Sequence, residues 1–421
     1  MVQKVRVTAK TVLVSAFRIE VEIDEGSEKK VLFFKSDVPF WEDAPLNDDY
    51  IAVALCHYCS NKKLDLFIDG SVTESVLRNL DEHIKIWSVW RPDLYSQVRI
   101  EARNAATDSP RRDKPAVMAF SGGLDACFSL AAHQAKWEGD PGRSIMLGIL
   151  IVGFDIKEKE QSTIRLAYKS AKRILGAFGA GCAMIATNWQ TDFCPDWRMG
   201  CDVGLACVLH TLADGYSRGI ISADDSFLEE LRDDPYSCNM TTNHLLGSYT
   251  FPVLLTGGTH TRLEKAGFAC KYPVFLNNLR VCWQRLESGT NCGVCEKCVR
   301  TRLEMMVYGV EPDIFNQPME ERQIEQLDFK SEETFGYFEE IYMNFPKDNR
   351  YYNVIQKIYL EKKDSFNGIK KLTDEIIAKN REIKSIKDEL NVLRNLKSYK
   401  ITKPLRAFEN EYNTIFCLKK D

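Results

Sequence analysis

Apolar residues recur along the chain with two periods, one typical of strands and one typical of helices. Near the N-terminus, stretches that alternate apolar and polar positions and are rich in β-branched residues predict half-buried strands. Stretches with apolar residues three and four apart predict helices. The predicted strands are residues 4–24, 29–37 and 64–69, and the predicted helices are residues 50–60 and 71–87. We expect these elements to form an N-terminal α+β domain, residues 1–110, which ends in a polar, proline-containing linker (105–115).

After this linker, short apolar runs alternate with amphipathic stretches. The predicted strands are residues 116–120, 144–154, 182–189 and 219–225, and the predicted helices are residues 126–133, 158–179 and 200–217. Strands that alternate with helices predict a parallel sheet with helices on both faces. The expected fold class is therefore α/β, a doubly wound, Rossmann-like parallel sheet within a second domain of residues 115–310. Such sheets bind ligands at the carboxyl ends of their strands.

The C-terminal region, residues 330–421, has a third pattern. Its first part, residues 331–362, is rich in aromatic residues and predicts helices. Apolar residues then follow a heptad repeat that only Lys379 interrupts, at Ile369, Leu372, Ile376, Ile383, Ile386, Leu390 and Leu393. This repeat predicts a coiled coil over residues 366–397. It can join two copies of the chain, bind another protein or dock on its own domain, and the heptads alone do not decide between these.

Composition indicates the expected cellular compartment and argues against nucleic acid and membrane as partners. The 56 basic and 60 acidic side chains give a net charge of −4, which offers no whole-chain sign of nucleic-acid binding. No apolar run approaches the roughly 18 residues that a membrane span requires. The N-terminus lacks the apolar core of a secretory signal. Fourteen cysteines without such a signal are typical of a reducing compartment, so we expect a cytoplasmic protein.

The loop of residues 121–125, Ser-Gly-Gly-Leu-Asp, follows an apolar strand and precedes a helix. Two adjacent glycines allow backbone conformations that bring amides close to a ligand. Amides at a helix N-terminus favour an anion such as phosphate. Ser121 adds a hydroxyl donor, and Asp125 offers oxygen ligands for Mg²⁺. The spacing differs from that of a Walker A loop and from that of a dinucleotide-binding fingerprint, so it predicts another kind of phosphate loop.

Four cysteines, Cys282, Cys292, Cys295 and Cys298, form a C-x9-C-x2-C-x2-C array. Four thiolates satisfy tetrahedral Zn²⁺, and a site made only of cysteines leaves no open position, which is typical of a structural zinc knuckle. An iron–sulfur cluster is the alternative occupant.

Together these motifs resemble a known family. The stretch SGGLDA, residues 121–126, resembles the Ser-Gly-Gly-x-Asp-Ser loop of the PP-loop ATP pyrophosphatases, which are adenine nucleotide alpha hydrolase-like enzymes. With the cysteine array, residues 115–305 resemble the 7-cyano-7-deazaguanine synthase family. The resemblance implies ATP, Mg²⁺ and Zn²⁺, and a ligase that adenylates a carboxylate, a deazapurine among the candidates. Pyrophosphate leaves, and ammonia or an amine then gives an amide or a nitrile. The sequence departs from the family at Ala126, where the family has Ser, and at Gly267, where it has Glu.

The resemblance and the predicted sheet also suggest site residues. Ser121, Gly122, Gly123, Leu124 and Asp125 would bind the phosphates, with Asp125 also taking part in catalysis. At the strand ends, Thr187 and Asn188 would border the adenosine, and Asp155 is a further candidate for the site. Ser222, Asp224 and Asp225 would lie beside the second substrate, with Ser222 also a cofactor-binding residue and Asp224 a catalytic residue. Lys265 and Arg262 would neutralise the departing pyrophosphate, and His260 is a weaker candidate for a base.

The segment Cys56-His57-Tyr58-Cys59 invites a redox or metal interpretation. Its two cysteines share one helical face with Ala52 and Leu55, and free cysteines are commonly small core residues, so the sequence favours a core role.

Three other functions are compatible with the motifs. One is a tRNA-thiolating PP-loop enzyme, whose cysteines would serve sulfur transfer or a cluster. Another is an adenylating amide ligase that acts on a sugar, peptide or protein amine. The third is a catalytically inactive assembly module that binds nucleotide and zinc, which Ala126 supports.

Overall fold

The computed structural model describes residues 6–41, 47–110, 113–135, 144–231, 235–282, 290–329 and 331–395. The chain divides into two compact units, residues 1–354 and residues 355–421. The boundary expected at 110–115 therefore lies inside the first unit and not between units.

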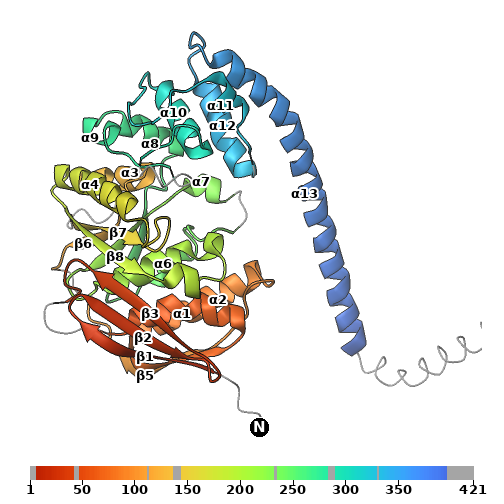
Figure 1. Cartoon of the computed structure of the whole chain (residues 1–421). Coiled ribbons are helices and arrows are strands. Elements are labelled where there is room, and N and C mark those ends of the chain that lie inside the picture. The colour runs from red at the N-terminus through yellow and green to blue at the C-terminus, as the bar shows by residue number, and fades with distance from the viewer. Residues whose placement is uncertain are drawn as a thin grey trace, which may run out of the picture. The chain divides into compact units, whose positions relative to one another are not determined.

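The first unit is built on one ten-stranded, mostly parallel sheet (Figure 1). Its strands lie in the order β10-β9-β6-β7-β8-β3-β2-β1-β4-β5. Their bounds are β1 Arg6–Ser15, β2 Arg18–Asp24, β3 Lys29–Ser36, β4 Asp65–Thr73, β5 Ile100–Ala106, β6 Ala116–Ala119, β7 Ile145–Val152, β8 Gly181–Thr187, β9 Arg218–Ser222 and β10 Val253–Thr256. The expected α/β class with a large parallel sheet is confirmed.

The five strands from β6 to β10 are all parallel and form one half of the sheet. In chain order they run 3-2-1-4-5 across the sheet, as in doubly wound sheets, and the direction of winding reverses at β6. Alternate residues of β6 face opposite sides: Val117 and Ala119 belong to a core with α6, whereas Ala116 and Met118 belong to a core with α3 and α4. Helices therefore cover both faces, and the reversal at β6 marks the place where such a sheet binds a ligand.

The N-terminal segment continues this sheet instead of forming a core of its own. Strand β3 pairs antiparallel with β8, with Phe34 opposite Thr187. Asn188, at the end of β8, strengthens this junction because its side chain accepts from Phe33 N at 3.0 Å and donates to Val31 O at 2.8 Å. The alternating pattern in the sequence predicts the strands but does not reveal that their partner is β8, some 150 residues away.

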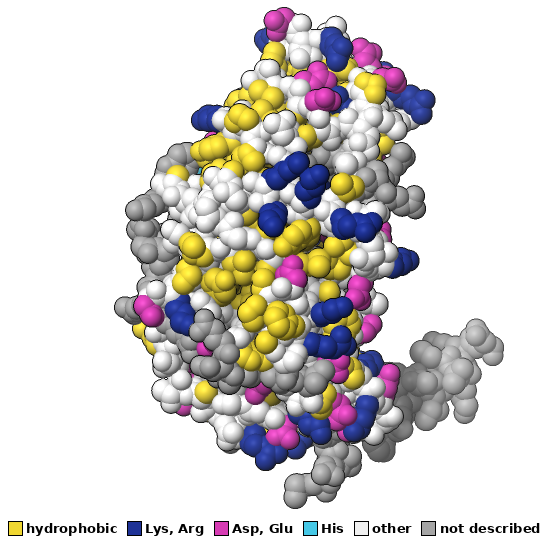
Figure 2. Space-filling view, turned by 60° about the vertical axis from the view of Figure 1, so that its left-hand side comes forward, with side chains coloured by type: hydrophobic (Ala, Val, Ile, Leu, Met, Phe, Trp, Pro, Cys, Tyr) yellow, Lys and Arg dark blue, Asp and Glu magenta, His cyan; other side chains and the backbone are white. Residues whose placement is uncertain are grey.

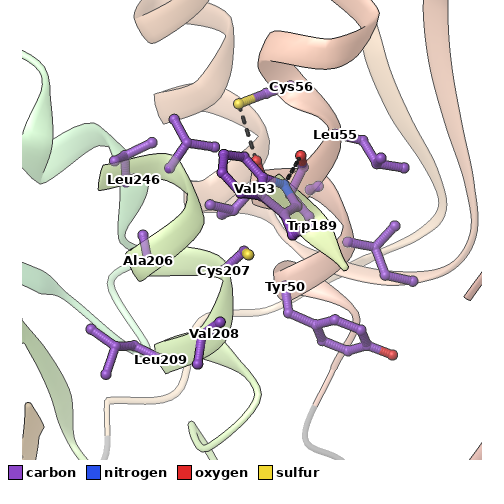
Figure 3. Packing of buried hydrophobic residues seen from close by; sticks show 14 of the residues in the cluster. Tyr50, Val53, Leu55, Cys56, Trp189, Ala206, Cys207, Val208, Leu209 and Leu246 are labelled. Carbon is purple, nitrogen blue, oxygen red and sulfur yellow. Dashed lines mark hydrogen bonds between the residues drawn. The ribbon is translucent and has the colours of Figure 1, made fainter. Parts of the chain in front are cut away.

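Helix packing also ties the N-terminal segment to the rest of the unit. Trp189 is fully buried between α1 and α6, and its Nε1 donates to Ala54 O at 2.7 Å (Figure 3). At Gly204 of α6 any side chain would meet the Trp189 ring at 2.5 Å, so the close approach requires glycine. Cys56 and Cys59 are fully buried in this core, as expected.

The helices of the first unit cover the sheet and extend beyond its carboxyl ends (Figure 1). Their bounds are α1 Asp49–Lys62, α2 Glu74–Trp90, α3 Leu124–Gln134, α4 Gln161–Ala177, α5 Trp189–Phe193, α6 Trp197–His210, α7 Phe227–Glu230, α8 Arg262–Ala269, α9 Pro273–Leu276, α10 Glu296–Val307, α11 Glu321–Glu325 and α12 Glu332–Asn344, with the 3₁₀ helix η1 Asn243–Leu246. Helix α2 begins after Thr73, three residues later than predicted, because residues 71–73 still pair with β5.

One helix, α13 (Tyr352–Asn395), accounts for the described part of the second unit. It includes most of the predicted coiled coil, whose last two residues, 396 and 397, lie outside the described residues. Four heptad residues are exposed on it: Ile376, Ile383, Ile386 and Leu390. The helix is therefore observed, and its pairing with a second helix stays a prediction.

Candidate functional site

The loop between β6 and α3 has the backbone that its two glycines predict. Gly122 has a positive φ of 76°, a conformation that side chains disfavour. Gly123, extended with φ −75° and ψ 173°, directly precedes the first residue of α3. Its amide donates to Ser121 Oγ at 3.1 Å, and Gly122 O accepts from Arg280 N at 2.9 Å. The loop therefore presents a helix N-terminus beside the point where the sheet reverses its winding.

A cavity of about 240 Å³ opens in front of this loop. Eight residues predicted to bind nucleotide or substrate line it, namely Ser121, Gly123, Leu124, Asp125, Asp155, Ser222, Asp224 and Arg262. Apolar residues of β7 and the aromatic rings of Phe120, Phe154 and Trp197 form much of the remaining wall. Ser222 Oγ is buried and has no hydrogen-bond partner among the described residues, so it is available to a bound molecule. The cavity therefore combines a phosphate-type loop, carboxylates and an apolar wall.

Several predicted residues lie elsewhere among the described parts of the chain. Asn188 serves the β3–β8 junction described above. His260 contacts Thr259 Oγ1 and the ring of Phe128, outside the cavity lining. Asp225 accepts a hydrogen bond from Tyr337 of α12, which leaves Asp224 as the carboxylate of this turn that lines the cavity.

Lys265 lies behind the cavity wall and not in its lining. Its side chain is fully buried, and Nζ donates to Ala223 O at 2.8 Å and lies 3.6 Å from Asp125 Oδ1. This position suits a residue that holds Asp125 in place better than one that contacts pyrophosphate. At Gly267 an added side chain would meet the ring of Tyr308 at 2.3 Å, so a larger residue here would require this ring to move.

Asp125 is the centre of a buried charge network. Arg262 Nη1 lies 2.7 Å from Asp125 Oδ2, and Arg262 Nε lies 3.3 Å from Glu304 Oε1. Burial raises the pKa of Asp125, but the positive charges of Arg262 and Lys265 outweigh burial, so the pKa is lowered overall. Burial, and then the charge of Asp125, raise the pKa of Asp224. The two carboxyl groups therefore differ, with Asp125 held as the anion and Asp224 the easier to protonate.

The same network reaches the cysteine array through α10. Glu304 also lies 3.6 Å from Arg300 Nη1, and Arg300 Nε lies 2.6 Å from Glu296 Oε1. Arg300, Glu304 and Arg262 are all buried. A chain of alternating charges thus joins the phosphate loop to the helix that begins directly after Cys295.

Two basic residues of the cavity were not predicted from the sequence. Arg280 lies beside Ser121 and, two residues along the chain, precedes the first cysteine of the array. Lys297 stands between the third and fourth cysteines. Both line the cavity, and neither forms an ion pair within 4 Å among the described residues. Their positions next to the cysteines could have indicated their place at the cavity, because the cysteine array packs close to the phosphate loop and brings its neighbouring residues there.

A second unpredicted part of the wall contains Asp202 of α6 and Tyr236. Burial, and next the charge of Asp224, raise the pKa of Asp202 to about 7. Asn243 Nδ2 donates to Asp202 Oδ2 at 2.7 Å, and Tyr236 Oη donates to Asp224 Oδ2 at 3.2 Å. A carboxyl group that is partly protonated near neutral pH can both donate and accept hydrogen bonds.

The four cysteines of the array converge in a buried group. The Sγ atoms of Cys282 and Cys295 are 3.8 Å apart, and those of Cys292 and Cys298 are 3.9 Å apart. Zinc–sulfur bonds of about 2.3 Å at tetrahedral angles place two sulfurs about 3.8 Å apart. Backbone amides of residues 294 and 295 donate to Cys292 Sγ, as is common around metal-bound thiolates. The array therefore fits a tetrahedral metal ion, and Cys282 also lines the cavity.

Comparisons with protein-family models, with curated proteins and with solved structures found no match. Among the described residues, no helix is long and apolar enough to cross a membrane. On the face shown in Figure 2, basic and acidic side chains are interspersed.

Proposed function

We propose that the protein adenylates a carboxylate with ATP, releases pyrophosphate and passes the acyl group to ammonia or an amine, as in the 7-cyano-7-deazaguanine synthase family. One observation carries the proposal. The Ser121–Asp125 loop lies where the parallel sheet reverses its winding, and it opens on a cavity bordered by the cations Arg280 and Lys297. The tail of a nucleotide needs this combination of amides and positive charges.

The residues have the following roles in this proposal. The amides of the loop and the Ser121 hydroxyl bind phosphate oxygens. Asp125, held as an anion by Arg262 and Lys265, is the residue that would bind Mg²⁺, which supplies charge neutralisation at the phosphates when bound. Arg280 and Lys297 balance the charge of the leaving pyrophosphate.

The chemistry requires positioning more than covalent help from the protein. An oxygen of the substrate carboxylate attacks the α-phosphorus, the bond to the β-phosphate oxygen breaks, and pyrophosphate leaves. The product is an acyl-adenylate, whose AMP is a far better leaving group than an oxide. An amine nitrogen then attacks the acyl carbon, AMP leaves, and Asp224 or Asp202 can accept the proton that the nitrogen loses, since both lie in the wall.

The cysteine array would hold Zn²⁺ in this proposal. Because all four ligands are thiolates, the ion has no open position for a substrate. Its contribution is structural: it fixes the segment that carries Lys297 and Arg280 against the phosphate loop.

The test is a product analysis. Purified protein is incubated with ATP, Mg²⁺ and carboxy-deazaguanine, with and without ammonium, and the nucleotides are separated. The proposal expects AMP and pyrophosphate only when a carboxylate is present, and an amide only when ammonium is present; a nitrile would require a second ATP, whose AMP leaves with the amide oxygen. Asp125→Ala should abolish AMP formation while its zinc content stays that of the wild type. AMP formation that Asp125→Ala leaves unchanged would contradict the role of this residue.

Two observations favour a second candidate, a catalytically inactive module that binds nucleotide. Asp125 is already paired with Arg262, and Ala126 lacks the hydroxyl of the family loop. In that case ATP would bind, and no AMP would form with any carboxylate.

A further inference from the structure

A second group of metal-ligand side chains lies in the core, away from the cavity and the cysteine array. His57 of α1 and His83 of α2 are buried, and their Nε2 atoms are 2.9 Å apart. The thiol of Cys56 is fully buried beside them, and the three ligand atoms all lie within 4.8 Å of one another. The function proposed above does not use these residues.

Hydrogen bonds define which nitrogen atoms carry protons. His83 Nδ1 lies 3.3 Å from Thr242 O, and because a carbonyl only accepts, Nδ1 carries the proton. In the neutral ring with its proton on Nδ1, Nε2 of His83 is an acceptor. His57 Nε2 is then the donor to His83 Nε2, which leaves a lone pair on His57 Nδ1.

That lone pair is one of several unsatisfied polar atoms at this place. His57 Nδ1, Trp87 Nε1 and Tyr95 Oη are buried and have no hydrogen-bond partner among the described residues. The rings of Tyr95 and Trp87 lie 4.5 and 5.2 Å from the His57 ring. Buried polar groups are nearly always satisfied in native proteins, so three together require an explanation.

We propose that Cys56, His57 and His83 bind a thiophilic metal cation, either Zn²⁺ or Cu⁺. One thiolate and two neutral imidazoles are ligands that both ions accept. On binding, the Cys56 thiol releases its proton to solvent, and the proton of His57 moves from Nε2 to Nδ1, where the Tyr95 oxygen can accept a hydrogen bond. The bond from His83 Nδ1 to Thr242 O already orients that ring, as is usual for metal-bound histidines.

The geometry requires an adjustment of the two rings. Two imidazole nitrogens on tetrahedral zinc, with bonds of 2.0–2.1 Å, lie about 3.3 Å apart, so the two rings must separate by about 0.4 Å. Charge separates the two ions. Cu⁺ with one thiolate gives a neutral site, whereas Zn²⁺ leaves one positive charge in the core, so burial favours Cu⁺.

The site would give the N-terminal helices a role in the cavity. Thr242, which holds His83, is adjacent to Asn243, which holds Asp202 in the cavity wall. A metal ion between α1 and α2 would therefore fix the segment that positions Asp202.

The test measures the metal content of the full-length protein after dialysis against Zn²⁺ or a Cu⁺–glutathione complex. We expect two thiophilic ions per chain, and one in His83→Asn. The matched control is His210→Asn, since His210 is a buried histidine that also bonds a backbone carbonyl but belongs to no group of metal-ligand side chains among the described residues. It should keep both ions. The identity of the second ion distinguishes Zn²⁺ from Cu⁺.

X-ray absorption on the wild type provides a measurement that does not depend on a variant folding. The cysteine array contributes only sulfur neighbours, so imidazole nitrogen neighbours at the metal support the proposal. A single ion per chain with only sulfur neighbours would overturn it, and so would a His210→Asn protein that loses as much metal as His83→Asn.

Discussion

Lys297 offers the sharpest test of the link between the cysteine array and nucleotide binding. It lies at the cavity, between Cys295 and Cys298, and its side chain is exposed. Unit charges about 4 Å apart interact by about 1 kcal/mol in water and about 4 kcal/mol at an effective dielectric constant of 20. Because Lys297 is exposed, the lower end applies, although a triphosphate carries several charges. We expect Lys297→Ala to weaken ATP binding by about 1–2 kcal/mol, which is a rise in Kd of about 5- to 30-fold.

The assay is calorimetric titration with a non-hydrolysable ATP analogue at low and high salt. Screening should shrink the effect of Lys297→Ala at about 1 M salt, where the Debye length falls to roughly 3 Å. Lys271→Ala is the matched control, because Lys271 is an exposed lysine outside the cavity lining. A Kd for Lys297→Ala within about twofold of the wild type at low salt would refute the phosphate contact, as would an equal loss in Lys271→Ala.

Removal of zinc extends the same test. If the ion acts by placing Lys297, then chelation should weaken binding of the analogue by at least as much as Lys297→Ala. The two perturbations should also not add, because zinc-free protein has already lost the placement. Fully additive losses would mean that the array and Lys297 act independently.

Four further outcomes follow from the structure. Asp125→Asn should lower AMP formation by at least about 100-fold while analogue binding changes far less, measured by rapid quench, because the amide cannot bind Mg²⁺ as an anion. Cys295→Ser should lose zinc and lower the thermal midpoint, measured by metal analysis and calorimetry. Burial raises the folded pKa of Asp202 to about 7, so the contribution of Asp202 to stability is full below pH 4 and is lost as pH rises towards 7. The free energy of unfolding in urea should therefore be lower at pH 8 than at pH 5 by on the order of 2 kcal/mol, and Asp202→Asn should remove this difference. Ile383→Lys should abolish self-association in light scattering, whereas Val392→Lys, on an exposed position outside the heptad, should not.

Sequence patterns predicted those parts of the site whose residues lie close together along the chain. The glycine loop and the four cysteines are contained in short stretches whose spacing already determines which atoms can meet. Gly122 takes the positive φ expected of it, and the sulfurs are separated as a tetrahedral ion requires. The alternation of strands and helices likewise predicted the parallel half of the sheet. The spacing of apolar residues distinguishes a strand from a helix, and strands joined by helices form a parallel sheet.

Contacts between distant segments could not be predicted in this way. Asn188 was expected beside a nucleotide, yet its amide satisfies two backbone groups of β3, since an edge strand accepts any partner with free amides and carbonyls. Lys265 was expected at the pyrophosphate and lies instead behind Asp125. Neither outcome has a signature in the local sequence, because the position of a side chain relative to a cavity depends on how whole elements pack.

The packing also explains why so much of the first unit contributes to one cavity. Asp125 is held by Arg262, which shares Glu304 with Arg300, so the phosphate loop and α10 are joined by a buried chain of charges. Removing one member would leave a buried charge without its partner, which costs far more than the loss of an exposed pair. On the other side, α1 packs against α6, which carries Asp202. The loop and the cysteine array therefore place residues in the cavity wall together, and the N-terminal segment supports that wall from behind through the packing of α1 on α6.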